Sequence, residues 1–196
     1  MVPTPASGVL NLVTGPDDQL WFTEVTGNKI GRVSTDGLFS EFGLPTSGSD
    51  PRGIAHGHDD NLWITEFAGN KIARVTRSGQ PTEFAVPTRA SGPVFITPGQ
   101  DNAMWFTELN GNKIGRISLD GQITEIPVPS AGAQPRGIAL GPNGDVWFTE
   151  SGSNKIARIS LNPTAAPSRP PACPRHATVA PAETRHGAVT SPRCPE

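Results

Sequence analysis

One block of sequence occurs four times in this chain at a fixed spacing. Its first copy contains the run Leu20-Trp21-Phe22-Thr23-Glu24, and the matching tryptophans are Trp21, Trp63, Trp105 and Trp147. Successive tryptophans are 42 residues apart, with no insertion or deletion. A strict period of about 40 to 50 residues is typical of β-propellers, in which each repeat folds into one blade. The spacing therefore predicts a repeat protein.

Each repeat contains four short stretches of strand-forming residues. In the second copy these stretches are 52–56, 61–66, 71–76 and 81–86. The residues between them are rich in Gly, Asn, Asp and Pro, which favour turns. No segment of useful length has a helical period. The sequence therefore predicts an all-β fold, an arc of a β-propeller with four antiparallel, four-stranded blades of 42 residues each.

The turn before the fourth stretch predicts the register of the blade. It carries Asp36-Gly37 in the first repeat, a dipeptide that favours a two-residue type I′ hairpin. Such a turn would place Arg32 opposite Glu41. The preceding loop would place Glu24 opposite Lys29. Cross-strand pairs contribute only about 0.2–1 kcal/mol each, so we expect them to specify the pairing more than to stabilise the fold.

The repeat pattern stops after Asn162. A fourth strand in the last blade would need a glutamate near position 167, where the chain has Pro167, so Arg158 is expected to lack a glutamate partner. Residues 163–196 contain 8 prolines and no aromatic residue. Such a composition buries too little apolar surface to offset the chain entropy. We therefore expect a propeller domain over 1–162 and a disordered Pro/Ala/Arg-rich tail over 163–196.

Charge and hydropathy restrict the partners. The formal net charge is −2 and both signs are interspersed, which predicts neither a nucleic-acid surface nor a polybasic membrane patch. No apolar run is long enough to span a membrane, and the first residues lack a signal-peptide pattern, so a cytoplasmic location is expected. Uncovered strands or faces of the first and last blades predict self-association.

The repeat unit closely resembles that of the virginiamycin B lyase family, which confers resistance to streptogramin B antibiotics. The resemblance covers residues 2–162 and is carried by Gly15-Pro16-Asp17, Leu20 to Glu24, Gly111 to Ile117 and Asp120 to Ile126. It implies a seven-bladed propeller, of which this chain has fewer than four complete blades. It also implies a carbon–oxygen lyase that opens a cyclic depsipeptide at its ester bond by elimination, using Mg²⁺ and a histidine base.

In that family the histidine lies in a Pro-His-Gly triplet at the start of a blade's first strand, after a metal-binding glutamate. The corresponding triplets here are Pro51-Arg52-Gly53, Pro93-Val94-Phe95 and Pro135-Arg136-Gly137. None contains histidine, and arginine stays protonated near neutral pH, so no catalytic base is identified. The candidates for a ligand face are Asp50, Arg52, Gln134 and Arg136, which could hold an anionic or carbonyl-bearing ligand.

Other polar sets are weaker candidates for metal sites. One glutamate is repeated in every blade, at Glu24, Glu66, Glu108 and Glu150. These carboxylates could offer oxygen ligands to Mg²⁺, but we favour the interpretation that each forms a structural pair with a lysine. His56 and His58 flank a turn at the other end of the blade from Arg52. The tail set is Cys173, His176, His186 and Cys194, around which no compact framework is predicted. No metal site is predicted from these residues.

Three functions remain open from the sequence. The leading one is a lyase-like propeller, incomplete and impaired in this chain. The second is a non-catalytic propeller that binds ligands or acts as a scaffold on the same face. The third is a lactone-hydrolysing propeller enzyme, for which the expected metal-binding set of Glu, Asn and Asp is missing.

Overall fold

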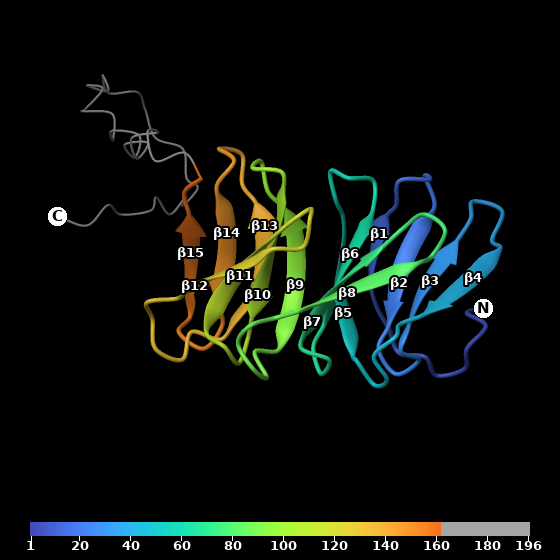
Figure 1. Cartoon of the computed structure of the whole chain (residues 1–196), viewed down its shortest axis with the longest axis horizontal. Helices are drawn as coiled ribbons and strands as arrows, with labels where there is room; N and C mark the ends of the chain where they lie inside the picture. The colour runs from blue at the N-terminus through green and yellow to red at the C-terminus, as the bar shows by residue number, and fades with distance from the viewer. Residues whose placement is uncertain (162–196) are drawn as a thin grey trace, which may run out of the picture. The chain divides into compact units, whose positions relative to one another are not determined.

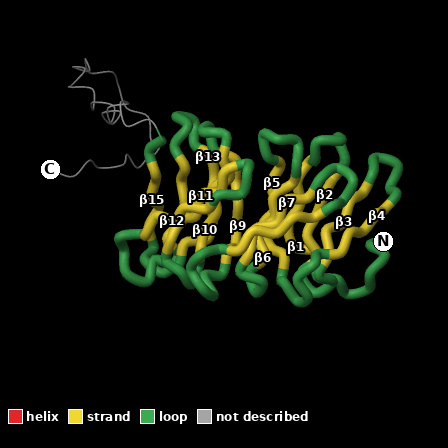
Figure 2. The backbone as a smooth tube through the Cα atoms, viewed as in Figure 1, coloured by secondary structure: helices red, strands yellow, loops and turns green. Residues whose placement is uncertain are grey.

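The described residues fold into consecutive antiparallel sheets. The structure is a computed structural model that describes residues 1–161, which belong to one compact unit. Three sheets have four strands and the fourth has three, each paired in chain order (Figure 1). These residues contain no helix, and so none that could cross a membrane (Figure 2). The all-β prediction is confirmed, whereas the predicted disordered tail lies outside the described residues.

Each sheet is one blade, and its strands follow the stretches expected from the sequence. Blade 1 contains β1 (Val9–Thr14), β2 (Leu20–Glu24), β3 (Lys29–Val33) and β4 (Phe39–Gly43). Blade 2 contains β5 (Pro51–His56), β6 (Leu62–Glu66), β7 (Lys71–Val75) and β8 (Pro81–Ala85). Blade 3 contains β9 (Pro93–Pro98), β10 (Ala103–Glu108), β11 (Lys113–Ser118) and β12 (Ile123–Pro127). Blade 4 contains β13 (Pro135–Leu140), β14 (Val146–Glu150) and β15 (Lys155–Ile159).

The hydrophobic core lies between blades. At the first boundary, Trp21 and Ile30 of blade 1 pack with Leu62 and Ile64 of blade 2, and all four side chains are fully buried. Similar clusters fill the next two boundaries. Because side chains alternate between the faces of a strand, every interior blade is apolar on both faces. A blade therefore depends on its neighbours for burial.

The hairpin that joins the third and fourth strands differs from the prediction. Ser34 donates its N–H to the carbonyl of Leu38, and Gly37 donates to the carbonyl of Ser34, which closes a three-residue loop. Gly37 has a φ of 81°, but Asp36 is not among the residues with positive φ. This is a type I turn followed by a left-handed glycine, instead of a type I′ turn.

That extra loop residue shifts the register by one. Arg32 lies opposite Ser40, and Glu41 lies opposite Gly31, so the predicted Arg32–Glu41 pair is wrong. A shift of one residue places the two side chains on opposite faces of the sheet. The predicted positions of Glu24 opposite Lys29 are confirmed.

The ionic partners within a blade also differ from those expected. Lys71 donates to Glu83 Oε2 at 2.5 Å, and Thr46 donates to the same carboxylate through its N–H and its hydroxyl. Lys29 and Lys113 have the same arrangement in blades 1 and 3. Arg158, expected to lack a glutamate partner, forms an ion pair with Asp145 at 3.1 Å. The glutamate of the fourth strand therefore binds a lysine. The arginines of blades 1, 3 and 4 bind an aspartate in the turn before the second strand, whereas Arg74 of blade 2 donates to the carbonyl of Leu119 in blade 3.

Candidate ligand face

A threonine in the second strand of blades 1 to 3 bonds to the innermost strand of the next blade and so places the innermost strands side by side. Thr65 accepts a hydrogen bond from Gly53 N–H of its own blade at 2.8 Å and donates to Val94 O of the next blade at 2.7 Å. Thr23 and Thr107 donate in the same way to Arg52 O and Arg136 O. Arg52, Val94 and Arg136 thus occupy equivalent positions on neighbouring innermost strands. These bonds bring into one row the three residues that the predicted resemblance aligns with the family's histidine.

The loops that enter the first strand and join the second to the third lie at the same end of a blade. Phe67 N–H donates to Asp50 O, and Ala68 N–H donates to Ser49 O, so the two loops are bonded to each other. Pro51 pairs with Glu66, which places Arg52 next to the end of the second strand. The predicted ligand face therefore has the loop arrangement expected from an antiparallel meander.

Asp50 and Arg52 bond to each other on this face. The guanidinium of Arg52 donates to both carboxylate oxygens of Asp50, at 3.0 and 2.8 Å, a bidentate ion pair. The same guanidinium lies 3.5 Å from the ring centroid of Phe67, within the range of a cation–π interaction. Side-chain exposures of 28% and 22% leave the pair accessible. Asp50 and Phe67 therefore fix the orientation of the Arg52 cation.

Gln134 and Arg136 occupy the corresponding positions in blade 4 but are not joined. Ser151 donates its hydroxyl to the backbone carbonyl of Gln134 at 2.7 Å. Arg136 is exposed, and within residues 1–161 its guanidinium has no carboxylate partner. The structure thus presents one oriented arginine and one exposed arginine with free donors. Both can bind carbonyl or anionic groups, and neither can accept a proton at neutral pH.

The sequence prediction missed Phe67. This residue follows Glu66 at a position where the other repeats carry Val25, Leu109 and Ser151. A single aromatic residue at an otherwise variable repeat position is a signal that could have identified it. The contact with Arg52 required the loop geometry, because Arg52 lies in β5 whereas Phe67 lies in the turn after β6.

The repeated glutamates are buried inside the blades. Glu24, Glu66 and Glu108 are fully buried, and their carboxylate oxygens have no hydrogen-bond partner among residues 1–161. Burial and the nearby negative charge of Glu83 raise the pKa of Glu66 to about 8. Burial and the charge of Glu125 raise the pKa of Glu108 to about 7. The lysines expected to pair with these carboxylates instead bind the glutamates of the fourth strands, so the predicted structural pair is wrong.

The two histidines have structural surroundings. His58 Nε2 lies 2.9 Å from Gly99 O in the next blade, and His56 Nε2 lies 3.6 Å from Asp60 Oδ1. Both lie at the far end of β5 from Arg52, as predicted. Neither residue reaches the candidate ligand face.

The Mg²⁺ ion implied by the resemblance does not fit the described residues. Asp50, which the resemblance aligns with the family's metal-binding glutamate, has both oxygens bound to Arg52. Over residues 1–161 there is no group of three or more His, Cys, Asp or Glu side chains arranged to hold a metal. Mg²⁺ prefers an octahedral set of oxygen ligands, commonly including carboxylates. Residues 1–161 supply no such set.

Comparison with known proteins gives consistent results. The model of the virginiamycin B lyase family matches residues 1–180. A virginiamycin B lyase from Bordetella parapertussis is 46% identical over 44 residues, which cover 22% of this chain and 15% of that protein.

Solved structures extend the similarity to the fold. The virginiamycin B lyase of Staphylococcus aureus superposes with a TM-score of 0.80 at 49% identity, covering 82% of this chain and 55% of that one. A catalytically inactive variant of that enzyme, solved with quinupristin, gives a TM-score of 0.81, also at 49% identity, over 83% of this chain and 55% of that one. This chain therefore spans about half the length of these relatives.

Proposed function

Because this chain belongs to the virginiamycin B lyase family, we propose that residues 1–161 form a ligand-binding part of a streptogramin B lyase-like propeller. The observation that carries the proposal is the row of Arg52, Val94 and Arg136 on neighbouring innermost strands, at the family's histidine position. The ligand class that this row would take is a cyclic depsipeptide. A relative of the same fold was solved with the streptogramin quinupristin, which supports that class.

The chemistry of the residues favours binding without turnover. Ring opening by elimination requires a base to remove a proton from the carbon next to the one that bears the ester oxygen, on the alcohol side of the ester. The electron pair then forms a C=C bond as the C–O bond breaks and the carboxylate leaves. A base and an electrophile each contribute orders of magnitude to such a step. Arg52 and Arg136 cannot serve as the base and Val94 has no ionisable group, so we expect no enzyme-like rate from this chain.

Binding would use the arginines as hydrogen-bond donors. Arg136 is exposed and has no carboxylate partner within residues 1–161, so its N–H groups can reach the ester and amide carbonyls of a depsipeptide. Arg52 is held over Phe67 at 3.5 Å, so little side-chain entropy is lost when it donates to a ligand. The ring of Phe67 adds apolar surface beside the cation. These features support recognition of a large, carbonyl-rich ring.

The test separates binding from turnover. The purified chain is titrated with virginiamycin B and, separately, incubated with it in excess Mg²⁺ while ring opening is followed by mass spectrometry. We expect saturable binding that Arg136→Ala weakens by about tenfold, the effect of one lost charge-assisted hydrogen bond. Arg77→Ala, in a turn between the third and fourth strands, serves as the matched control and should leave binding unchanged.

Two outcomes would contradict the proposal. Turnover above buffer that is abolished by EDTA and by Arg52→Ala would show that this chain has a working catalytic centre. No binding of virginiamycin B would favour the second candidate function, a scaffold propeller without this ligand. This second candidate needs no catalytic base, and the exposed Arg136 could bind another ligand on the same face.

The described residues do not supply a set of ligands for Mg²⁺. We propose that any Mg²⁺ used by a complete propeller is held by ligands outside residues 1–161. Its chemistry there would be to stabilise the negative charge that develops on the ester carbonyl. The bonds between Asp50 and Arg52 support this restriction, because a metal at Asp50 would have to displace the guanidinium.

We also propose that the chain self-associates through its end blades. Leu20 in blade 1 is 44% exposed and Ile156 in blade 4 is 71% exposed, although the equivalent residues of interior blades are fully buried. The face that blade 1 leaves open matches the one that blades 2 to 4 bury against a preceding blade. Sedimentation velocity should show concentration-dependent association that Leu20→Glu reduces. A concentration-independent monomer would contradict the proposal.

A further inference from the structure

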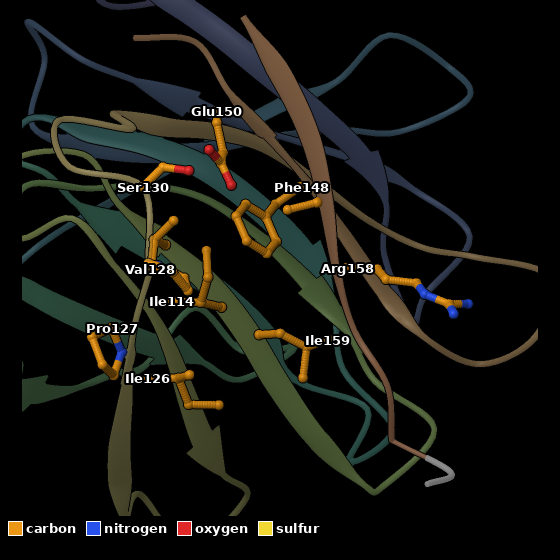
Figure 3. Close-up of a pocket in the computed structure, with 11 residues that line it drawn as sticks. Ile114, Ile126, Pro127, Val128, Ser130, Phe148, Glu150, Arg158 and Ile159 are labelled. Atoms are coloured by element: carbon orange, nitrogen blue, oxygen red, sulfur yellow. The ribbon is translucent and has the colours of Figure 1, made fainter. Parts of the chain in front are cut away.

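The outer edge of β15 borders a groove between blades 3 and 4. The groove has a volume of about 370 Å³. Ser130 and Glu150 lie at one end and Ile126 and Ile159 at the other, with Phe148 between them (Figure 3). The sheet of blade 4 ends at β15, so this edge has no strand partner among residues 1–161. The groove and the open edge form one surface, which we call the blade 4 acceptor site.

Blade 2 shows what fills the same place when a fourth strand is present. β7 has the sequence Lys-Ile-Ala-Arg-Val and β15 has Lys-Ile-Ala-Arg-Ile. β8 pairs with β7 with Glu83 opposite Ala73 and Thr82 opposite Arg74. Because β15 repeats four of five residues of β7, it offers an added strand nearly the same partners. The sequence of β8 is therefore a template for an occupant.

The cradle for a carboxylate is preserved in blade 4. In blade 2, Glu83 accepts hydrogen bonds from Lys71 Nζ and from the N–H and hydroxyl of Thr46. The corresponding groups in blade 4 are Lys155 and Ser130, and Lys155 Nζ lies 3.3 Å from Ser130 Oγ. Within residues 1–161 no carboxylate is hydrogen-bonded to Lys155 or Ser130, although Glu150, the equivalent of Glu66 in blade 2, lines the same end of the groove. Charge complementarity thus requires an acidic residue in the occupant.

An aromatic anchor is present on the other face of the blade. In blade 2, Phe84 stacks on Trp63 at 5.9 Å, and Arg74 lies over both rings. In blade 4, Arg158 lies 5.7 Å from the ring of Trp147, which is 36% exposed. The residue after the glutamate of an added strand would cover this ring. Stacked aromatic pairs contribute beyond the area they bury.

The chain's own sequence at the matching register does not supply these groups. Pro167 stands at the position equivalent to Glu83, and Ser168 stands at the position equivalent to Phe84. Proline has neither a carboxylate nor a backbone N–H to donate. An occupant from another molecule satisfies both requirements.

We propose that the blade 4 acceptor site binds an extended peptide segment of another protein, which adds as a fourth antiparallel strand and carries a glutamate followed by an aromatic residue. The backbone of the segment pairs with β15, as peptides do when they extend an exposed sheet edge. Its glutamate enters the groove to meet Lys155 and Ser130, and its aromatic ring covers Trp147. The partner is defined by the pattern Thr-Glu-Phe within an otherwise extended segment.

The test uses the full chain and a synthetic peptide. A fluorescent peptide with the sequence of residues 80–87, Gln-Pro-Thr-Glu-Phe-Ala-Val-Pro, is titrated with the protein and followed by anisotropy. We expect saturable binding. A peptide with glutamine in place of its glutamate should bind about tenfold more weakly, since it loses a charge-assisted hydrogen bond. A scrambled peptide should not bind.

Protein variants locate the site. Lys155→Ala should lower the affinity of the protein for the unmodified peptide by about tenfold. Lys71→Ala, at the same position of a complete blade, should not change that affinity. Hydrogen exchange of the complex should slow the amides of β15. No saturable binding up to about 1 mM, equal binding of the scrambled peptide, or protection elsewhere than β15 would each overturn the proposal.

Discussion

Blades 2 and 4 share almost the same third strand, yet that strand has different surroundings in each. β7 and β15 differ only in their last residue, valine or isoleucine. Ile72 of β7 is fully buried, whereas Ile156 of β15 is 71% exposed. A fourth strand and a following blade cover β7, and neither covers β15 within residues 1–161. Burial in this protein is therefore set by neighbouring blades and not by the local sequence.

The largest expected effect comes from truncating the same repeat position in both blades. Ile72→Ala should lower the free energy of unfolding by about 2–5 kcal/mol, because it opens a cavity between blades 2 and 3. Ile156→Ala should change it by less than about 0.5 kcal/mol, because that side chain is mostly in water. Urea denaturation of both variants measures the difference. Equal losses would show that blade 4 is covered to the same extent as blade 2.

Protonation of the buried glutamates should make stability depend on pH. Folding raises the pKa of Glu66 from 4.5 to about 8, so the folded state binds more protons between those values. The free energy of unfolding should therefore fall as pH rises from about 5 to 8 and level off above that. Glu66→Gln should reduce this loss by roughly 2–4 kcal/mol.

The control for this prediction is Asp36→Asn, in an exposed turn, which should keep the wild-type pH profile. Folding also raises the pKa of Glu108, to about 7. The free energy of unfolding of the Glu66→Gln variant should therefore still fall with rising pH, but less steeply than that of the wild type. An unchanged slope in Glu66→Gln would mean that the carboxylate is charged and has found a partner in the folded protein.

The lysine–glutamate pair of the outer strands should have a smaller effect. Glu83→Gln removes a charged acceptor from Lys71 and Thr46, and should cost about 1–3 kcal/mol of stability. Lys155→Ala, at the position of blade 4 where no acid is bound within residues 1–161, should cost less than about 0.5 kcal/mol. Thermal denaturation of the two variants compares them. A larger loss for Lys155→Ala would indicate that the acceptor site is already occupied.

The smallest effect is expected from Mg²⁺. Residues 1–161 contain no group of acids and histidines arranged to hold a metal. A ligand stabilises a protein only in proportion to its binding to the folded state. Addition of 10 mM MgCl₂, compared with NaCl at equal ionic strength, should therefore shift Tm by less than about 1 °C. A larger shift that Asp50→Asn abolishes would place a metal on the candidate ligand face.

The fold was predictable because the same pattern of strand and turn residues occurs four times in the sequence. Strand positions and blade order within residues 1–161 follow from a 42-residue period. The hairpin register was not predictable, because a glycine at positive φ is shared by the two-residue and the three-residue turn. The choice between them decided whether Glu41 meets Arg32 or lies on the other face with Lys29.

The site was predictable only in part. The alignment of triplets placed Arg52 and Arg136 on one face, and the hydrogen bonds of the threonine row are consistent with it. The Asp50–Arg52 pair and the ring of Phe67 beneath it depend on loop conformation, including a φ of 55° at Asp50. Aspartate adopts a positive φ more often than most residues, but Gln134 has the same conformation at the equivalent position of blade 4, so the residue type alone does not identify it.

Hydrogen exchange of two identical segments tests the central claim most directly. Residues 71–74 and 155–158 both read Lys-Ile-Ala-Arg, so differences in exchange report structure more than sequence. The account predicts that the amides of 71–74 exchange at least about 100-fold more slowly, because a fourth strand and a following blade must open first. Equal protection of the two segments would contradict the conclusion that neighbouring blades, and not the repeat sequence, decide burial in this protein.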